Sequence, residues 1–517
     1  MISRNKATKR SKSLVRLRQL SQLLFFALFL WASHKSLRLF FETNPSLMVF
    51  TSIAGRKLAG GILGVAVMLG LTAVLGRFFC GWVCPMGSVI DAVGAVKRRR
   101  NGLSESANRV VRRPKYAIWV ALLVLALAGI QYAWVLDPIT IAGRFTTMRV
   151  FPLFAYALDG VFRLGGQLPV VGEWLVDFGR SLSLGEPGSR KYGDAASTVM
   201  TGLFLLAAGS AVLVPRLWCR SLCPLGAFYA LVGRAAPMER RNRGCTECQV
   251  CSARCRMGAI RDDGEYEKGE CIMCMDCVYD CPTSRTAFNF SDSKPAGESD
   301  GGRGVTRAQF LSLAAVPLVV RNAPVIKTVA GAIGGLRDPI RPPGAVSGGE
   351  IGTVCVRCGN CMKVCPTNVI QPHMAGLGDL WTPVMEYSVG SCSYNCKRCG
   401  DACPTGAIRR MALPDKRKYV IGVAIVEKAK CYPWSTGEEC LVCEEHCPIP
   451  DKAIKMKRRD LGGGRTVKCP EIDRNLCNGC GICQNKCPVL PVAIRVAPAG
   501  TGKHPGLKTN KEDRYSA

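Results

Sequence analysis

A single cysteine pattern, repeated six times between residues 245 and 487, constrains the fold of this chain more than any other feature. Its regular form is Cys-x2-Cys-x2-Cys-x3-Cys, and the regular copies begin at Cys245, Cys271, Cys355 and Cys477. The copy at Cys392 has one extra residue in its first gap, and the copy at Cys431 has a longer first gap. Repetition at this fidelity indicates one recurring structural unit.

The spacing of the pattern is typical of bacterial-type [4Fe–4S] ferredoxins. Three cysteines two residues apart wrap a tight loop over three corners of a cubane. Glycines beside them let the backbone approach the inorganic sulfurs; they are Gly359, Gly400, Gly479 and Gly481. Zinc ribbons have two more widely separated Cys-x2-Cys pairs without a third cysteine, and clusters of cysteines this close rarely meet disulfide geometry.

The fourth cysteine of each copy is expected to reach the neighbouring cluster, which groups 24 of the 29 cysteines into six sets of iron ligands. The first and second sets are Cys245, Cys248, Cys251 and Cys281, then Cys271, Cys274, Cys277 and Cys255. The third and fourth are Cys355, Cys358, Cys361 and Cys403, then Cys392, Cys396, Cys399 and Cys365. The fifth and sixth are Cys431, Cys440, Cys443 and Cys487, then Cys477, Cys480, Cys483 and Cys447. The sequence therefore predicts six [4Fe–4S] clusters in three pairs.

Two positions depart from this regularity. Arg256 follows the fourth cysteine of the first copy, where the other copies have proline. In the fifth set Cys469 competes with the distant Cys431, but Cys469-Pro470 would enter from the other side of the motif, so we favour Cys431.

Four apolar stretches precede the cysteine repeats: Leu20–Ala32, Leu58–Gly76, Tyr116–Leu136 and Ala195–Pro215. The last three are close to the ~20 residues that a membrane-spanning helix needs. The first spans only if the charged residues after it snorkel or face the bundle. The alternative, a signal peptide, lacks a small-residue cleavage site.

Charge orients these four predicted spans. Residues 1–19 carry seven Lys or Arg and no acid, residues 77–115 carry nine against two acids, and residues 216–243 carry six against one. The loop 137–194 carries six of each sign, so the positive-inside rule exports this loop and keeps both ends of the bundle in the cytoplasm. The net charge of +31 is then a topology signal and no nucleic-acid partner is expected.

The predicted fold class is a membrane all-α four-helix bundle followed by three α+β bacterial-type dicluster ferredoxin domains. The protein is expected in a bacterial-type inner membrane as a multi-pass protein, with the lipid bilayer around the bundle and the first dicluster domain in the cytoplasm. The predicted divisions are a basic cytoplasmic head at 1–19, the transmembrane domain at 20–235, dicluster domains at 240–290, 345–410 and 411–496, a linker at 291–307, an apolar segment at 308–336 and a disordered tail at 497–517.

The apolar segment 308–336 leaves the location of the last two dicluster domains open. The sequence from Val305 to Leu311 resembles a twin-arginine export signal, with Ala308 where the second arginine belongs. Either this segment is an export anchor that puts the last four clusters in the periplasm, or it is a hydrophobic linker on the cytoplasmic face. We favour export.

Two further cysteine pairs lie where predicted spans leave the membrane, Cys80 with Cys84 and Cys219 with Cys223, each in a Cys-x3-Cys-Pro sequence. Three interpretations stay open for these loops. They form a joint redox-active dithiol or metal site, they dock the ferredoxin domain, or they are buried cysteines at helix ends.

These loops, the four spans and the following dicluster unit make residues 1–290 resemble the NapH/MauN type of membrane ferredoxin protein, a quinol dehydrogenase component. Residues 337–494 resemble the NapG/MauM type of four-cluster ferredoxin, especially at Cys431-Tyr-Pro-Trp and Cys396-Lys-Arg-Cys-Gly. The resemblance implies a fusion of two proteins that pass electrons from the membrane quinone pool to a downstream reductase or cytochrome.

The sequence favours an electron conduit over a bond-making enzyme, because it has no nucleotide-binding fingerprint and no Cys-x-x-Cys-His haem site. Asp137 and His34 are weak candidates for releasing quinol protons; the favoured interpretation is that Asp137 caps a helix end and that His34 is a snorkelling residue at the membrane interface. The alternative functions are a maturation factor that handles copper or another metal through its Cys-x3-Cys-Pro loops, and an electron-storage subunit without a quinone site.

Overall fold

The computed structural model describes residues 2–97, 103–157, 194–242, 245–246, 248–283, 285–290, 339–346, 350–375, 378–460 and 466–498. It divides into two compact units, which we describe separately. The first unit comprises Met1–Arg149, Ser197–Ala332 and Thr353–Cys358, and the second comprises Val150–Ala196, Ile333–Gly352 and Gly359–Ala517. The predicted linker 291–307, the whole of the apolar segment 308–336 and the tail beyond residue 498 lie outside the described residues.

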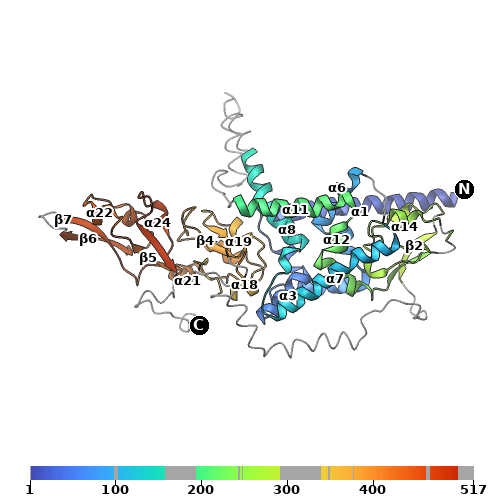
Figure 1. The fold of residues 1–517 in the computed structure, drawn as a ribbon, viewed down its shortest axis with the longest axis horizontal. Coiled ribbons are helices and arrows are strands. Elements are labelled where there is room, and N and C mark those ends of the chain that lie inside the picture. The colour runs from blue at the N-terminus through green and yellow to red at the C-terminus, as the bar shows by residue number, and fades with distance from the viewer. Residues whose placement is uncertain are drawn as a thin grey trace, which may run out of the picture. The chain divides into compact units, whose positions relative to one another are not determined.

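Helices form most of the first unit (Figure 1). In chain order they are α1 (Ile2–His34), α2 (Leu39–Glu42), α3 (Pro45–Gly55), α4 (Ile62–Leu75), α5 (Phe78–Trp82), α6 (Pro85–Lys97), α7 (Glu105–Leu127), η1 (Ala133–Val135), α8 (Pro138–Phe145), η2 (Thr146–Val150), α11 (Asp194–Leu213), α12 (Leu217–Ser221) and α13 (Pro224–Gly233). α7 packs against α3, α12 and α13, while α1 packs against α5 and α6.

Capping residues explain where several of these helices begin. Asn44 caps α3 by accepting a hydrogen bond from the Leu47 N–H at 3.2 Å, and Ser104 caps α7 by accepting one from Ala107. Proline follows the cap of α3, α8 and α13, where its fixed φ and missing N–H suit the first helical turn.

Two of the four predicted spans are helices of the expected length, and two are shorter than predicted. Among the described residues, Lys12–His34 and Ala195–Leu213 are long and apolar enough to cross a membrane. The predicted span at 58–76 contains only the 14-residue α4, which lies between Gly61 at φ +85° and Gly76 at φ +70°. The predicted span at 116–136 ends as a helix at Leu127, just before Gly129 at φ +80°. Left-handed glycines end helices because they carry no Cβ penalty there.

A small ferredoxin domain completes the first unit. Its elements are β1 (Met238–Asn242), α14 (Val250–Arg254), η3 (Lys268–Glu270), α15 (Asp276–Tyr279) and β2 (Thr286–Phe290). β1 and β2 pair antiparallel, with Met238 opposite Phe290, so the two ends of the cysteine-bearing segment are held together. This domain packs on the helices through η3 against α13 and α15 against α1.

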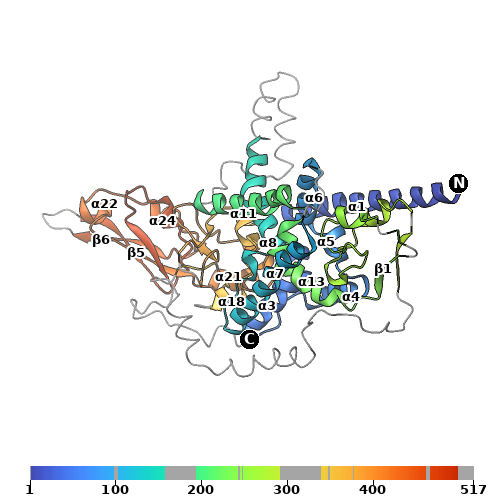
Figure 2. The same ribbon diagram turned by 45° about the vertical axis from the view of Figure 1, so that its right-hand side comes forward.

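The second unit consists of short helices and two-stranded antiparallel sheets (Figure 2). Its helices are α18 (Ile351–Val354, whose last two residues are assigned to the first unit), α19 (Asn360–Lys363), α20 (Arg398–Asp401), α21 (Leu413–Lys418), α22 (Tyr432–Ser435), α23 (Val442–Glu445) and α24 (Ile482–Lys486). Its sheets pair β3 (Ile370–Pro372) with β4 (Pro383–Met385), β5 (Gly422–Val426) with β8 (Ile494–Pro498), and β6 (Ile454–Asp460) with β7 (Thr466–Ile472).

The cysteine repeats contribute their own core residues. A small or branched residue and an apolar partner follow each fourth cysteine, and in five copies both are at least nine-tenths buried: Ala259-Ile260, Val369-Ile370, Ala407-Ile408, Ala453-Ile454 and Ala493-Ile494. The second copy differs, because Ala287 is exposed on β2. The described residues therefore form a mostly helical architecture with small sheets and dicluster ferredoxin domains.

Candidate functional site: the cysteine loops

In three of the four regular cysteine loops the backbone turns left-handed on both sides of the second cysteine. These positions are Met273 and Met275 around Cys274, Arg357 and Gly359 around Cys358, and Gly479 and Gly481 around Cys480, with φ between 51° and 83°. Two left-handed residues curl the chain so that backbone N–H groups point into the loop. Gly400 instead allows a close backbone approach, because a Cβ there would lie 2.4 Å from the carbonyl oxygen of Arg409.

A cavity in the first unit is lined by Cys255, Cys271, Cys274 and Cys277, together with apolar residues. Backbone N–H groups point at its sulfurs: Met273 donates to Cys271 Sγ at 3.5 Å and Ala259 donates to Cys255 Sγ at 3.3 Å. Such N–H···S bonds stabilise thiolates that ligate iron. The donor set therefore fits an iron–sulfur cluster.

A second cavity of the same kind lies in the second unit, lined by Cys431, Cys440, Cys443 and Cys487. Cys469 is not among its lining residues. Its thiol lies on β7, fully buried, 3.5 Å from the carbonyl oxygen of Pro433.

The other predicted sets differ in burial. Cys447, Cys477 and Cys483 belong to one apolar core. Burial raises the pKa of Cys392 and of Cys399, and the nearby thiols of Cys365 and Cys396 raise it further. Cys245 and Cys248 are exposed, whereas Cys355, Cys358 and Cys361 are buried. Cys403 Sγ accepts a hydrogen bond from the Ile408 N–H at 3.4 Å. Within the described ranges, no three His, Cys, Asp or Glu side chains are placed to hold one metal ion.

The four cysteines of the Cys-x3-Cys-Pro loops form one buried group, the cysteine tetrad (Cys80, Cys84, Cys219 and Cys223). Cys84 and Cys223 precede the first turns of α6 and α13 and accept hydrogen bonds from Gly87 and Gly226. Burial, with further charge repulsion from Cys80, raises the pKa of Cys219 to about 11, and burial also raises the pKa of Cys84 and Cys223. The structure thus brings together two loops that lie about 140 residues apart in the sequence.

Two buried arginines frame the tetrad. Arg216 donates from Nη1 to the Cys80 carbonyl at 2.7 Å and from Nη2 to Asp91 at 2.7 Å. Arg77 donates from Nη1 to Glu270 at 2.9 Å. Although burial opposes ionisation, the charge of Arg216 holds the pKa of Asp91 far below its usual range.

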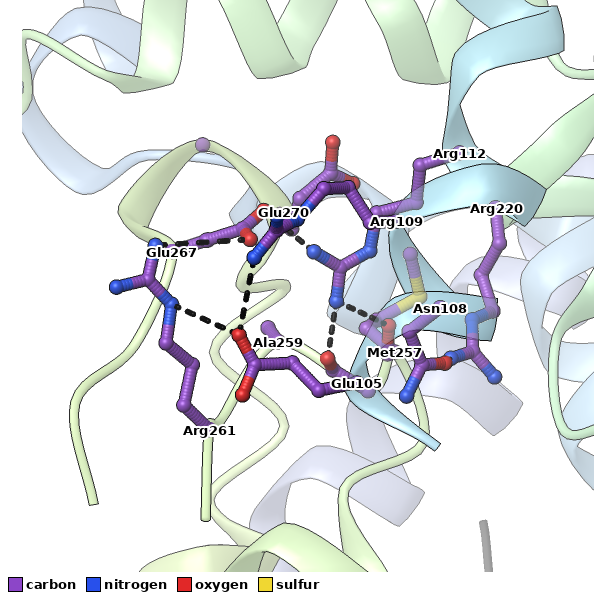
Figure 3. A network of polar contacts seen from close by, with 12 residues as sticks. Glu105, Asn108, Arg109, Arg112, Arg220, Met257, Ala259, Arg261, Glu267 and Glu270 are labelled. Atoms are coloured by element: carbon purple, nitrogen blue, oxygen red, sulfur yellow. Dashed lines mark hydrogen bonds and ion pairs between the residues drawn. The ribbon is translucent and has the colours of Figure 1, made fainter. Parts of the chain in front are cut away.

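An ion-pair network attaches the ferredoxin domain to α7 (Figure 3). Arg112 pairs with Glu267 and donates to the Gly258 carbonyl, and Glu270 binds both Lys115 and Tyr116. Figure 3 also shows the Arg261 side chain directed toward Glu105, at the beginning of the same helix. The docked surface is therefore built from acids in the loop before Cys271 and bases on α7.

Arg256, the exception to the cysteine-proline rule, belongs to this docking surface. Its guanidinium pairs with Asp276 next to the second cluster loop and lies 3.1 Å from Asp91 Oδ1 on α6. A proline here could form neither ion pair.

Sequence comparison agrees with these iron–sulfur sites. Residues 58–102 and 197–243 match a family described as a 4Fe-4S binding domain, 354–407 match the 4Fe-4S dicluster domain, 470–491 match a further 4Fe-4S binding domain, and 243–286 match the NosR family. Over 177 residues the chain is 36% identical to the methylamine utilization ferredoxin-type protein MauM of Methylorubrum extorquens, which covers 32% of this chain and 78% of MauM. The ferredoxin-type protein NapG of Escherichia coli is 31% identical over 204 residues, 36% of this chain and 84% of NapG.

The chain belongs to the family of ferredoxin-type proteins that includes MauM and NapG. It is therefore an iron–sulfur electron-transfer protein with several [4Fe–4S] clusters. The MauM/NapG relationship covers about a third of its length. An uncharacterized protein of Methanocaldococcus jannaschii is 25% identical over 289 residues, 54% of this chain and 97% of that protein. No solved structure matches the chain.

Asp137 and His34, the two weak candidates for proton release in this MauM/NapG-family protein, lie at helix ends. Asp137 is fully buried and caps α8, accepting hydrogen bonds from Thr140 and from Asn44 Nδ2 at 2.8 Å. The helix of the predicted third span ends at Leu127, so Asp137 lies beyond its end. His34 is the last residue of α1 and is partly exposed.

Sequence reasoning missed the docking residues, above all Asp91 and Glu270. Neither belongs to a motif, and each gains its importance from arginines far away in the sequence. One signal was available: the replacement of proline by Arg256 in an otherwise regular repeat.

Proposed function

We propose that this protein is a membrane-bound polyferredoxin, a NapH/MauN-type component fused to a NapG/MauM-type one, that passes electrons from quinol to a downstream reductase or cytochrome. The observation that carries the proposal is the pair of cavities each lined by four cysteines, one of which comes from the neighbouring motif. When bound, [4Fe–4S] clusters supply one-electron transfer.

Six ligand sets follow from the spacing, as assigned above. The cavities support the second and fifth sets, including Cys431 as a ligand in preference to Cys469. The first and third sets rest on spacing alone. The four apolar stretches of the first unit are proposed as a bundle in the bilayer, with the basic segments in the cytoplasm.

Direct backbone contacts favour an order of transfer inside the second unit. The Cys392 N–H donates to the Cys480 carbonyl at 2.8 Å, so the loops of the fourth and sixth sets touch. Tyr387 strengthens the same junction by donating from its hydroxyl to the Gly479 carbonyl at 2.6 Å. Short spacing between sites is what electron transfer through a protein requires, so the fourth and sixth sites are proposed as neighbours in the relay.

A groove supports the quinol part of the proposal. It has a volume of about 410 Å³ and is lined by apolar residues of α11 and by Trp218, Ser221 and Leu222 beside the tetrad. This volume suits a small apolar ligand with a few polar contacts. A quinol headgroup here would lie next to Cys219 and Cys223, with its apolar tail along α11.

An anaerobic reduction experiment tests the function. The full-length protein is purified in detergent, dithionite bleaching of the cluster absorbance is confirmed, and a menaquinol analogue is added to an oxidised sample. We expect the quinol to bleach the cluster absorbance. The variant Leu206→Trp, which fills the groove, should slow this bleaching. The control Leu490→Trp changes an exposed residue outside the groove and should leave the rate unchanged. Bleaching by dithionite alone would overturn the quinol proposal and favour the maturation alternative, which predicts that the cysteine tetrad delivers a metal.

A further inference from the structure

Arg240, in the middle of β1, places a buried positive charge in the ferredoxin domain of the first unit. Side chains alternate between the two faces of a strand, and Arg240 is the one buried residue of β1, with 6% of its surface exposed. Its Nη1 donates to the Gly264 carbonyl at 2.7 Å, and its backbone N–H donates to the Tyr266 hydroxyl at 2.7 Å. The loop between the first two motifs therefore holds both the backbone and the guanidinium of Arg240.

The same side chain faces ligands of two different sets. Its Nη2 donates to the Sγ of Cys251, a ligand of the first set, at 3.3 Å. It also lines the cavity of the second set together with Cys271 and Cys277. Burial raises the pKa of Cys251 and of Cys277, and the charge of Arg240 opposes that rise at both thiols. One guanidinium therefore favours the thiolate form in both sets.

The described residues provide no carboxylate to balance this charge. The acceptors of the guanidinium are the Gly264 carbonyl and the Cys251 sulfur, and its Nε is buried without a hydrogen-bond partner. The next residue, Arg241, instead pairs with Glu239 at 2.9 Å. A buried charge without a counter-charge is strongly destabilising. A cubane with four thiolate ligands is an anion in both of its redox states, so the two clusters of this domain would supply the missing negative charge.

The last dicluster domain offers an internal comparison. Arg240 stands five residues before the first cysteine of its domain and lies opposite Phe288 on β2. Val426 stands five residues before the first cysteine of the last domain and lies opposite Ile494 on β8. Both side chains line a cavity formed by cluster cysteines. The dicluster fold therefore accepts an apolar residue at this position, and the charge of Arg240 serves something other than folding of the domain.

We infer that Arg240 is the shared counter-ion of the first and second clusters and that it raises the midpoint potentials of both. Reduction adds one negative charge to a cluster, and a fixed cation at its ligands stabilises that reduced form more than the oxidised one. The electron that the cluster gains is the electron that its donor loses, and no bond or proton is transferred. Arg240 acts through the cysteines and is a positioning residue. The inference rests on the proposed first and second ligand sets and is independent of quinol as the electron donor.

A dithionite titration of the full-length protein, followed by electron paramagnetic resonance, tests the inference. In Arg240→Met two cluster components should shift to lower midpoint potential, each by at least a tenfold change in its reduction equilibrium, which is about 59 mV for one electron. Arg240→Lys keeps the positive charge and should shift them less. The matched control is Arg241→Met on the other face of β1, where the side chain is 35% exposed, and it should leave every component unchanged.

Iron and sulfide content separates this electrostatic role from a structural one. Arg240→Met should keep the wild-type content, because every cluster cysteine remains. If that variant does not accumulate, Arg240→Gln removes the charge and retains an amide donor.

Four results would overturn the inference: unchanged potentials in the neutral variants, a shift of one component only, an equal shift in Arg240→Lys or Arg241→Met, or loss of iron with wild-type potentials in the clusters that remain. Failure of quinol to bleach the protein would overturn the proposed function instead, and it would leave these dithionite titrations unaffected.

Discussion

Arg77 donates a hydrogen bond to Glu270 at 2.9 Å, and the two side chains are 0% and 5% exposed. The pair joins the first Cys-x3-Cys loop to the residue that precedes Cys271, the first ligand of the second set. Lys115 and Tyr116 bind the same carboxylate, so α5, α7 and the ferredoxin domain meet at one buried acid. Docking of this domain and the shape of its cluster loop are therefore mechanically connected.

Replacing this acid should destabilise the first unit. In Glu270→Gln the positive charges of Arg77 and Lys115 stay buried without a counter-charge, which typically costs about 3–5 kcal/mol. Chemical denaturation of the detergent-solubilised protein measures the loss. Glu265→Gln is the control, because its partner Arg261 and Glu265 itself are both solvent-accessible and the change should stay below about 0.5 kcal/mol. Equal effects of the two variants would contradict the buried role.

The same carboxylate predicts a pH dependence. Although burial opposes it, the charges of Lys115 and Arg77 lower the pKa of Glu270 from 4.5 to about 2. A folded-state pKa below the unfolded one gives stability that is complete above pH 4.5 and is lost as the pH falls toward 2. The stability difference between wild type and Glu270→Gln should therefore shrink below that pH. A difference that stays constant on acidification would show that Glu270 titrates normally.

Arg256→Pro restores the regular cysteine-proline sequence and should nevertheless weaken docking. Asp91 and Asp276 each lose a charged partner, and truncating one member of a desolvated pair costs roughly 2–5 kcal/mol. Limited proteolysis between the helices and residues 240–290 should speed up while the iron content stays unchanged. Arg254→Ala, which removes a half-exposed pair with Asp280, serves as the control and should be silent.

Two glycines with nearly the same backbone conformation should differ in tolerance. At Gly481, φ +77°, a Cβ would lie 2.1 Å from the Tyr387 ring, whereas at Gly406, φ +74°, nothing lies within 4 Å. Gly406→Ala should cost only the left-handed strain of about 1–2 kcal/mol. Gly481→Ala adds a clash in the loop of the sixth set, so it should also lower the iron content. Similar thermal unfolding and iron content in both variants would disprove the clash.

The fifth set predicts different outcomes for two cysteines on neighbouring elements. Cys431→Ser should lose about four iron atoms, because its thiol lines the cavity with Cys440, Cys443 and Cys487. Cys469→Ser should keep its iron and lose at most the small packing contribution of a buried thiol. The reverse result would make Cys469 the ligand.

The cysteine loops are the part of the structure that the sequence could predict. A spacing of three residues between ligands is local, so it fixes the curl of each loop, and Gly359, Gly479 and Gly481 do take left-handed conformations. Met273, Met275 and Arg357 take the same conformation without being glycine, which no propensity indicates. The sequence also predicted that neighbouring motifs exchange their fourth cysteines, because those motifs lie close together along the chain.

Helix ends were less predictable. Hydropathy measures an apolar run but is insensitive to a single left-handed residue, so Gly61 and Gly129 shortened two predicted spans. The buried segment α8 also lay inside what charge counting treats as an exported loop, because its eight residues are too few to register as a span.

By itself the sequence determined the iron–sulfur chemistry of this protein, through cysteines at a fixed local spacing that is repeated six times after a basic helical half. Only the tertiary structure decided that Cys80 and Cys84 meet Cys219 and Cys223, that Arg77 and Arg216 cross between the two loops, and that Asp91 and Glu270 hold the ferredoxin domain. The reason is physical. Ligand spacing acts within one loop, whereas buried charge must find its partner wherever the fold brings one, and nothing local in the sequence records that distance.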